Sequence, residues 1–377
     1  YVGRGYWAWV SAFGLVLAAW WQAGVQSPTA FMTTAGLVIA AALVFGLPVI
    51  RRPLVSVPAM RLVRAILPGM GDTERIALEA GTVWWDGDLF SGNPDWQKLL
   101  DFVSQPLSEE EQEFLDGPVE KLCAMLDDWQ IAQDRDLPNK VWDFLKRERF
   151  FGMIIPTEYG GLGFSAIGHS AVIVKISSRS VTTAVTVMVP NSLGPAELLL
   201  HYGTDEQKKY YLPRLARGEE VPCFALTEPH AGSDAASTRS SGVVCRGTYK
   251  GKEVLGIRLN WNKRYITLAP VATVIGLAFR LFDPEGLLGR EEDIGITCAL
   301  IPRDVPGIKI GDRHDPMGVP FQNGPITGTD VFVPVDFVIG GQDGVGQGWK
   351  MLMESLAAGR SVSLPSLSVA AVELAAR

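Results

Sequence analysis

The most constraining feature of the sequence is a run from residue 5 to residue 50 that contains no charged side chain and no histidine. The polar turn QAGVQSP divides this run into two apolar stretches, residues 6–21 and 29–50. The hydrocarbon core of a bilayer takes ~20 helical residues, and tryptophans favour its interfaces. Each stretch is close to that length, and tryptophans lie near both ends of the first. The sequence therefore predicts two transmembrane helices, a helical hairpin, in residues 1–50.

Arginines flank the apolar run, and no acidic residue follows it before Asp72. These flanking residues are Arg4, Arg51, Arg52, Arg61 and Arg64. Because cytoplasmic flanks of membrane proteins are rich in Lys and Arg, both ends of the hairpin and the rest of the chain are expected in the cytoplasm. Residues 51–107 are expected to form a basic juxtamembrane segment, lying on anionic headgroups, and a linker. A cleaved signal peptide or a buried hairpin is the alternative, although two apolar runs exceed the apolar region of a signal.

Composition narrows the functions open to the rest of the chain. Its 377 residues exceed the ~100–200 of a usual domain, which predicts two or three domains. A net charge of −7 disfavours nucleic acid as a partner. The four cysteines lie far apart without a C-x-x-C pair, and the four histidines are scattered. We therefore expect reduced thiols and no metal site.

The sequence pattern changes twice after residue 107. Residues 108–220 indicate a helical domain, because Ser108 with Glu111 and Thr204 with Gln207 form capping boxes ahead of helical segments. Residues 221–340 contain short β-branched runs between glycines and prolines, which predict an antiparallel sheet domain. Helical spacing resumes in residues 341–377. The predicted fold class is α+β.

One glycine motif is a poor candidate for a nucleotide site. GLGFSA, residues 161–166, matches the G-x-G-x-x-[GA] dinucleotide pattern. The acid expected about 20 residues later is missing, since residues 175–190 contain no carboxylate. Any cofactor is therefore expected elsewhere.

The stretch CFALTEPHAGSD, residues 223–234, is a better candidate. It reads as a buried strand that ends in a proline and glycine turn, with the hydroxyls of Thr227 and Ser233 available to a ligand. The later stretch NKRYIT adds the aromatic ring of Tyr265 and the hydroxyl of Thr267. Hydroxyl donors and an aromatic wall would suit a flavin. The alternative is an ordinary glycine-rich turn and a core tyrosine.

Together these segments resemble one known family. YGGLG, NSLG, YLPRLARGE, ALTEPHAGSD, NKRYIT, PGIKIG and GQGWKMLMESLAAGR occur in the order found in acyl-CoA dehydrogenases, over residues 108–377. The hairpin and GTVWWDGDLF are similar to the large, membrane-associated bacterial branch that begins fatty-acid β-oxidation. The resemblance implies a helical N-terminal domain (108–220), a middle β domain (221–340) and a C-terminal helical domain that residues 341–377 begin, with FAD between the last two. It also implies a location at the bacterial inner membrane.

The resemblance assigns roles to individual positions. Those that match the flavin-binding segments of the family are Phe224, Ala225, Leu226, Thr227, Gly232, Ser233, Tyr265, Ile266 and Thr267. The Thr267 hydroxyl is expected near the reactive N5 of the flavin. Ser233 is also expected near the acyl-CoA, and Arg360 matches the arginine that contacts the CoA nucleotide.

The implied reaction is α,β-dehydrogenation of a fatty acyl-CoA to the trans-2-enoyl-CoA, in which a carboxylate removes the α-proton and the β-hydride passes to the flavin. Some members place the catalytic glutamate directly before the arginine, where this chain has Gly359, and Ala357 replaces another frequent acid. Glu228 belongs to the flavin turn, and Glu354 and Glu373 match no catalytic position. We therefore expect no catalytic base in this chain, which is expected to be a fragment at both ends.

Three functions stay open at this point. The first is an FAD-dependent acyl-CoA dehydrogenase that passes electrons to an electron-transfer flavoprotein, expected to act as a homo-oligomer. The second is an acyl-CoA oxidase or monooxygenase of the same superfamily, which the reaction of its reduced flavin with oxygen would identify. The third is a non-catalytic acyl-CoA-binding scaffold at the membrane.

Overall fold

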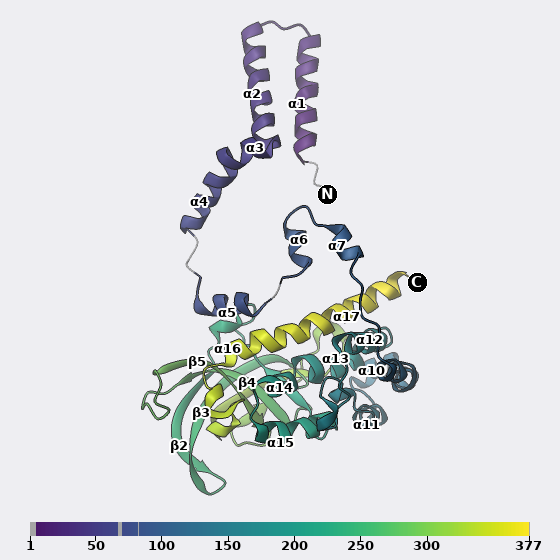
Figure 1. Cartoon of the computed structure of the whole chain (residues 1–377), viewed down its shortest axis with the longest axis vertical. Coiled ribbons are helices and arrows are strands. Elements are labelled where there is room, and N and C mark those ends of the chain that lie inside the picture. Colours follow the sequence, from purple (N-terminus) through teal and green to yellow (C-terminus); the bar gives the residue numbers. More distant parts are fainter. Residues whose placement is uncertain (1–4, 67–69, 82, 377) are drawn as a thin grey trace. The chain divides into compact units, whose positions relative to one another are not determined.

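The computed structural model describes residues 5–66, 70–81 and 83–376, and it divides into two compact units, Tyr1–Gly71 and Asp72–Arg377 (Figure 1). Arg4, one of the arginines that flank the first apolar stretch, lies outside the described residues.

The first unit is a helical hairpin followed by a basic helix. Its helices are α1 (Gly5–Gln22), α2 (Pro28–Gly46), α3 (Pro48–Arg51) and α4 (Val57–Ile66). The Tyr6 hydroxyl donates to the carbonyl of Ala42 at 2.9 Å, and Trp20 packs edge-on against Phe31, so α1 and α2 lie antiparallel. Among the described helices, α2 alone is long and apolar enough to cross a membrane. The transmembrane hairpin therefore stays a prediction.

The second unit begins with a series of helices. They are α5 (Asp72–Ala80), α6 (Asp86–Phe90), α7 (Trp96–Leu100), α8 (Glu109–Phe114), α9 (Glu120–Met125), α10 (Asp128–Asp134), α11 (Asn139–Arg147), α12 (Ala166–Ser177), α13 (Val181–Met188), α14 (Pro195–Tyr202) and α15 (Asp205–Ala216). Both predicted capping boxes form. The Glu111 N–H donates to the Ser108 hydroxyl at 3.2 Å, and the Ser108 N–H donates to the Glu111 carboxylate at 2.9 Å. Thr204 and Gln207 make the same reciprocal pair.

The GLGFSA segment is a tight turn and a helix cap. A Cβ added at Gly161 would lie 2.0 Å from the carbonyl oxygen of Ile155, so glycine is needed for close backbone packing. The Ser165 hydroxyl accepts from the N–H of Gly168 and caps α12. The segment before the turn, Thr157–Tyr159, is a 3₁₀ turn and not a strand.

A seven-stranded sheet follows the helices. Its strands are β1 (Pro222–Ala225), β2 (Ser241–Tyr249), β3 (Lys252–Thr267), β4 (Val274–Phe282), β5 (Asp293–Pro302), β6 (Ile308–Ile310) and β7 (Asn323–Pro334). Their order is β1-β4-β2-β3-β7-β6, with β5 paired to β4. The prediction of an antiparallel sheet is wrong for β4, which runs parallel to both β1 and β2. The reason is that β2 and β3 form a hairpin and β4 reverses direction once more.

One buried cluster joins the sheet to the helices that precede it. Val274 and Ala278 of β4 and Leu300 of β5 belong to it, together with Leu198 of α14 and Leu212 of α15. Burying these side chains removes apolar surface from water at roughly 25 cal/mol per Å². The helices thus hold the β4–β5 region of the sheet in place.

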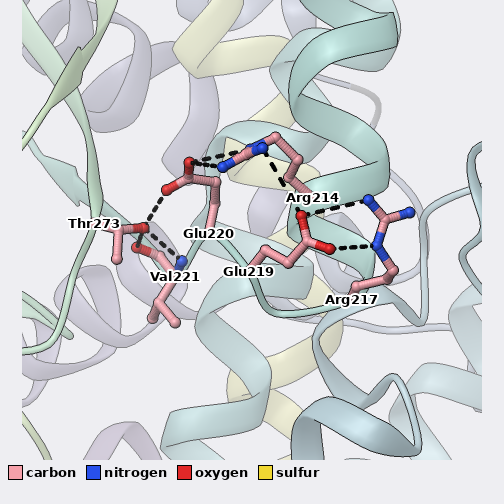
Figure 2. Close-up of polar contacts among 6 residues, drawn as sticks. All are labelled: Arg214, Arg217, Glu219, Glu220, Val221 and Thr273. Atoms are coloured by element: carbon pink, nitrogen blue, oxygen red, sulfur yellow. Dashed lines mark hydrogen bonds and ion pairs between the residues drawn. The ribbon is translucent and has the colours of Figure 1, made fainter.

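The passage from α15 into β1 is fixed by polar contacts, which Figure 2 shows. The Arg214 guanidinium donates to Glu220 at 3.2 Å, and Glu220 accepts from the Thr273 hydroxyl at the start of β4. The same hydroxyl accepts from the N–H of Val221 at 2.9 Å. These bonds fix the start of β1 against the start of β4.

The chain ends in α16 (Gly348–Met351) and the long α17 (Ala357–Ala376), which lies over α12 (Figure 1). The hydroxyls of Ser363 and Ser366 in α17 form hydrogen bonds of 2.8 Å with those of Ser192 and Ser170. Small side chains thus let α17 approach the helical part of the second unit closely.

Candidate functional site

The segments singled out in the sequence meet at a cavity of about 150 Å³ beyond the end of β1. Its lining residues are Val189, Phe224, Leu226, Thr227, Tyr265, Ile266, Thr267, Leu356 and Arg360. Most of the expected site residues are therefore brought together, from β1, β3 and α17. The cavity is smaller than the ~300–1000 Å³ typical of ligand pockets, so it would receive one end of a large ligand.

The end of β1 and the residue that follows it present alternate side chains to the cavity. Phe224 and Leu226 line it, whereas Ala225 between them is fully buried beneath the strand. Phe224 pairs with Gly276 of β4, where an added Cβ would lie 2.5 Å from the phenyl ring. The glycine therefore makes room for Phe224, and Ala225 contributes packing and not a lining side chain.

Tyr265 reaches the cavity through an irregularity in β3. The register between β3 and β7 shifts between Lys263 and Ile266, and Tyr265 has φ of 57°. A left-handed backbone is strained for a bulky residue, and such strain is concentrated at functional sites. The side chain is 54% exposed, so the alternative of a core tyrosine is wrong. Its ring packs 4.7 Å from that of His314, centroid to centroid.

Thr267 lies opposite a residue that sequence reasoning missed. It pairs with Asn323, the first residue of β7, whose side-chain amide lies 3.5 Å from the Thr267 hydroxyl. The amide oxygen of Asn323 is buried and has no hydrogen-bond partner among the described residues. A buried acceptor without a partner costs free energy, so this oxygen is suited to a ligand N–H. Only the hydrogen-bonded register of β3 and β7 could have identified it.

Besides Ala225, two expected residues do not reach the cavity. Gly232 and Ser233 lie in the exposed turn after β1, and neither lines the cavity. The turn closes through a hydrogen bond from the Glu228 N–H to the carbonyl of Ala231 at 3.0 Å. A ligand that reached Ser233 would have to extend out of the cavity along this turn.

Arg360 lines the cavity from α17, and its Nε donates to the carbonyl of Leu356 at 3.2 Å. At the preceding residue, Gly359, an added Cβ would meet the backbone of Ser192. No carboxylate of the described residues lines the cavity. Glu228 is buried behind the turn, where burial opposes its charged form but hydrogen bonds from Lys263, Ser240 and others lower its pKa to about 2.

Comparison with known proteins decides the family. The model of the acyl-CoA dehydrogenase N-terminal domain matches residues 107–219, and that of the acyl-CoA dehydrogenase middle domain matches residues 223–331. The chain belongs to the acyl-CoA dehydrogenase family. The resemblance found in the sequence motifs is thereby confirmed.

Three relatives match different shares of the chain. The human mitochondrial very long-chain specific acyl-CoA dehydrogenase is 33% identical over 282 residues, which are 72% of this chain and 40% of that protein. An acyl-CoA dehydrogenase of Bacillus subtilis is 30% identical over 197 residues, 50% of this chain and 48% of that protein. The HemX protein of Proteus mirabilis is 57% identical over 99 residues, 26% of this chain and 58% of that protein. The chain thus spans 40–58% of the length of these relatives.

Solved structures share the fold. Butyryl-CoA dehydrogenase of Megasphaera elsdenii has a TM-score of 0.62 at 22% identity, over 72% of this chain and 68% of that chain. PigA, solved with FAD and proline, has a TM-score of 0.59 at 21% identity, over 71% of this chain and 66% of that chain. The predicted acyl-CoA dehydrogenase fold, with a helical N-terminal domain and a middle β domain, is confirmed. Family membership supports the expectation of FAD.

The residues of the cavity fit the flavin end of FAD. Thr227 and Thr267 supply hydroxyls and Tyr265 an aromatic wall. Asn323 is not among the lining residues, but its buried oxygen without a partner belongs to the amide group whose nitrogen contacts the Thr267 hydroxyl. Apolar side chains complete the lining, and they are Val189, Phe224, Leu226, Ile266 and Leu356. A heteroaromatic ring with both donors and acceptors matches this set.

Proposed function

We propose that this chain provides the flavin site of an FAD-dependent dehydrogenase that acts on fatty acyl-CoA thioesters in β-oxidation. The main support for this proposal is the cavity lined by Thr227, Tyr265 and Thr267, in a chain that belongs to the acyl-CoA dehydrogenase family. The identity to very long-chain specific acyl-CoA dehydrogenase supports the choice of substrate.

The chain's own residues would bind and orient the two reactants. Thr227 and Thr267 would donate hydrogen bonds to ring heteroatoms, and Tyr265 would cover part of the flavin. Leu226, Ile266 and other apolar residues would exclude water, which strengthens hydrogen bonds within the site. Bound FAD would supply the hydride acceptor. Arg360 would place a positive charge at the mouth of the cavity for the phosphates of CoA.

The described residues bind and orient but do not remove the α-proton. A general base must lie within ~2.6–3.2 Å of its proton donor, or somewhat farther when the donor is carbon. Since no described carboxylate lines the cavity, we expect the 377-residue chain to hold FAD without dehydrogenating acyl-CoA. Electrons in the full reaction would pass to an electron-transfer flavoprotein, and the enzyme would act as a homo-oligomer.

The test is to purify the chain in detergent, load it with FAD and add palmitoyl-CoA under anaerobic conditions. We expect a shift of the oxidised flavin band without bleaching. Failure to bind FAD would overturn the proposed function, and rapid bleaching with formation of enoyl-CoA would show that the base lies within these residues. Fast production of peroxide by the dithionite-reduced flavin in air would favour the oxidase over the dehydrogenase.

We further propose that the first unit attaches the enzyme to the bacterial inner membrane with the second unit in the cytoplasm. The support is the apolar length of α2, which has no buried residue, and the four arginines between Arg51 and Arg64. Apolar side chains of α4, among them Met60 and Ile66, are exposed beside these arginines. Such a helix suits an anionic headgroup surface.

A further inference from the structure

Lys263 is a charged side chain with no exposed surface, in the interior of the sheet near the cavity. Its Nζ donates to the carboxylate of Glu228 at 2.7 Å, to the carbonyl of Leu226 at 3.0 Å and to the hydroxyl of Thr238 at 3.4 Å. All three hydrogens of the ammonium group are thus used inside the protein. No step of the proposed reaction uses this group.

Glu228 is equally committed to internal partners. Its carboxylate accepts from Lys263, from the hydroxyls of Thr238 and Ser240, and from the N–H groups of Arg239 and Ser240 at 2.8 Å and 3.1 Å. These hydrogen bonds connect the start of the turn after β1, at Glu228, to its end at residues 238–240. With 4% of its side chain exposed, Glu228 has lost most of its contact with water.

The two partners belong to the two segments that form the cavity. Glu228 directly follows Thr227, and Lys263 comes two residues before Tyr265. A backbone hydrogen bond from the Arg264 N–H to the carbonyl of Thr227, 3.0 Å long, joins the same segments. The bulge that turns Tyr265 into a left-handed conformation begins at Lys263. A bulge of this kind can slip by one residue, which would send the following side chains to the other face.

The need for stability does not explain such a pair. Desolvating two charges costs several kcal/mol, and well-packed apolar residues often stabilise a fold as well as or better than a buried ion pair. The special property of an ion pair is its dependence on geometry, because a small displacement leaves two uncompensated charges. A buried ion pair therefore favours one distance between the two segments that carry it and one register between them.

We infer that the buried Lys263–Glu228 pair is a positioning device that sets the register between the turn after β1 and the bulge in β3. The pair thereby holds the hydroxyls of Thr227 and Thr267 at the spacing that the flavin requires. The role in flavin binding rests on the proposed function, whereas the role in setting the register does not.

The deciding variant is the double substitution Lys263→Met with Glu228→Leu, which removes both charges without leaving either one unpaired. We expect it to fold with a lowered melting temperature, because the N–H groups of Arg239 and Ser240 lose their acceptor, and to bind FAD about tenfold more weakly with a shifted flavin spectrum. In the FAD-free protein, amide hydrogen exchange should rise in residues 226–234 and 263–268. Arg258→Met is the matched control on the same strand, because Arg258 pairs with Asp330 at the exposed surface, and it should change none of these measurements.

The single variant Glu228→Gln gives a second measurement if the double variant does not fold. It keeps the size of the side chain but lacks the charge and replaces one acceptor oxygen with an NH2 donor, so exchange should rise in the same two segments. Unchanged exchange in the variant that folds, with FAD affinity as in the wild type, would overturn the positioning role. A wild-type chain that binds no FAD would overturn the proposed function instead, and the exchange result would still decide the role of the pair.

Discussion

Gly359 of α17 lies directly against the backbone of Ser192, and a Cβ added at position 359 would come within 2.2 Å of that residue's carbonyl oxygen. Some members of the family carry their catalytic glutamate at this position, as noted from the sequence. In this chain the backbone of Ser192 occupies the space that a side chain at position 359 would need, where α17 contacts the helical part of the second unit. The missing carboxylate therefore has a structural reason, since no side chain fits there.

The contact predicts that Gly359→Ala destabilises the second unit. Because the clash is with backbone, overpacking should cost about 1–3 kcal/mol and loosen α17. Thermal and urea unfolding measure the loss. Gly117→Ala is the control, since that helical glycine has open space around its added Cβ and should be neutral or slightly stabilising. Equal stability of the Gly359→Ala and wild-type proteins would contradict the contact.

Thr267→Val should weaken FAD binding. Loss of one hydroxyl hydrogen bond costs about 0.5–1.5 kcal/mol, which corresponds to roughly a two- to tenfold rise in Kd. Titration of flavin fluorescence with the protein measures this Kd. Thr248→Val, the same change at an exposed position of β2, should leave Kd as it is. If both variants bind FAD like the wild type, Thr267 does not belong to the flavin site.

The acid stability of the protein should depend on Glu228. Its folded pKa is about 2, below the ~4.3 of an unfolded glutamate. Because the folded pKa is lowered, the stabilisation is fully present above the unfolded value and is lost as the pH falls toward 2. The difference in urea midpoint between the wild type and Glu228→Gln should therefore be largest above about pH 4.5 and shrink below it. A difference that stays constant from pH 7 to pH 3 would count against the charged pair.

Membrane attachment through the first unit predicts that the protein stays in the membrane fraction during washing with alkaline carbonate. An apolar helix of spanning length resists such extraction, whereas a peripheral contact does not. Immunoblots of pellet and supernatant measure the distribution. A tag placed near Thr73 should also be protected from protease added outside intact cells. Release by carbonate, or cleavage of the tag from outside, would refute the anchor or its orientation.

Local signals in the sequence predicted much of the structure. The capping boxes of α8 and α15 depend on residues three positions apart, and both form. The segments around Thr227 and Tyr265 were recognised because each carries a short motif, and the structure places both at one cavity. These features depend mainly on neighbouring residues.

Other features depend on partners distant in the sequence and could not be read from it. The parallel direction of β4 follows from the path of the whole sheet. Asn323 lies beside Thr267 only because of the register of β7 against β3. Ser233 was expected at the cavity because its motif ends there, but the turn that Glu228 and Thr238 hold carries it to the surface.

The short strand β1 is fastened at both ends. Glu220 and Thr273 hold the chain just before it, and Glu228 and Lys263 hold the chain just after it. A four-residue strand ordinarily frays from its ends. In β1 the contacts before and after the strand prevent fraying from either end. Its amides should therefore exchange with solvent only when the surrounding sheet opens as a whole, so the floor of the cavity would keep its shape whether or not a ligand is bound.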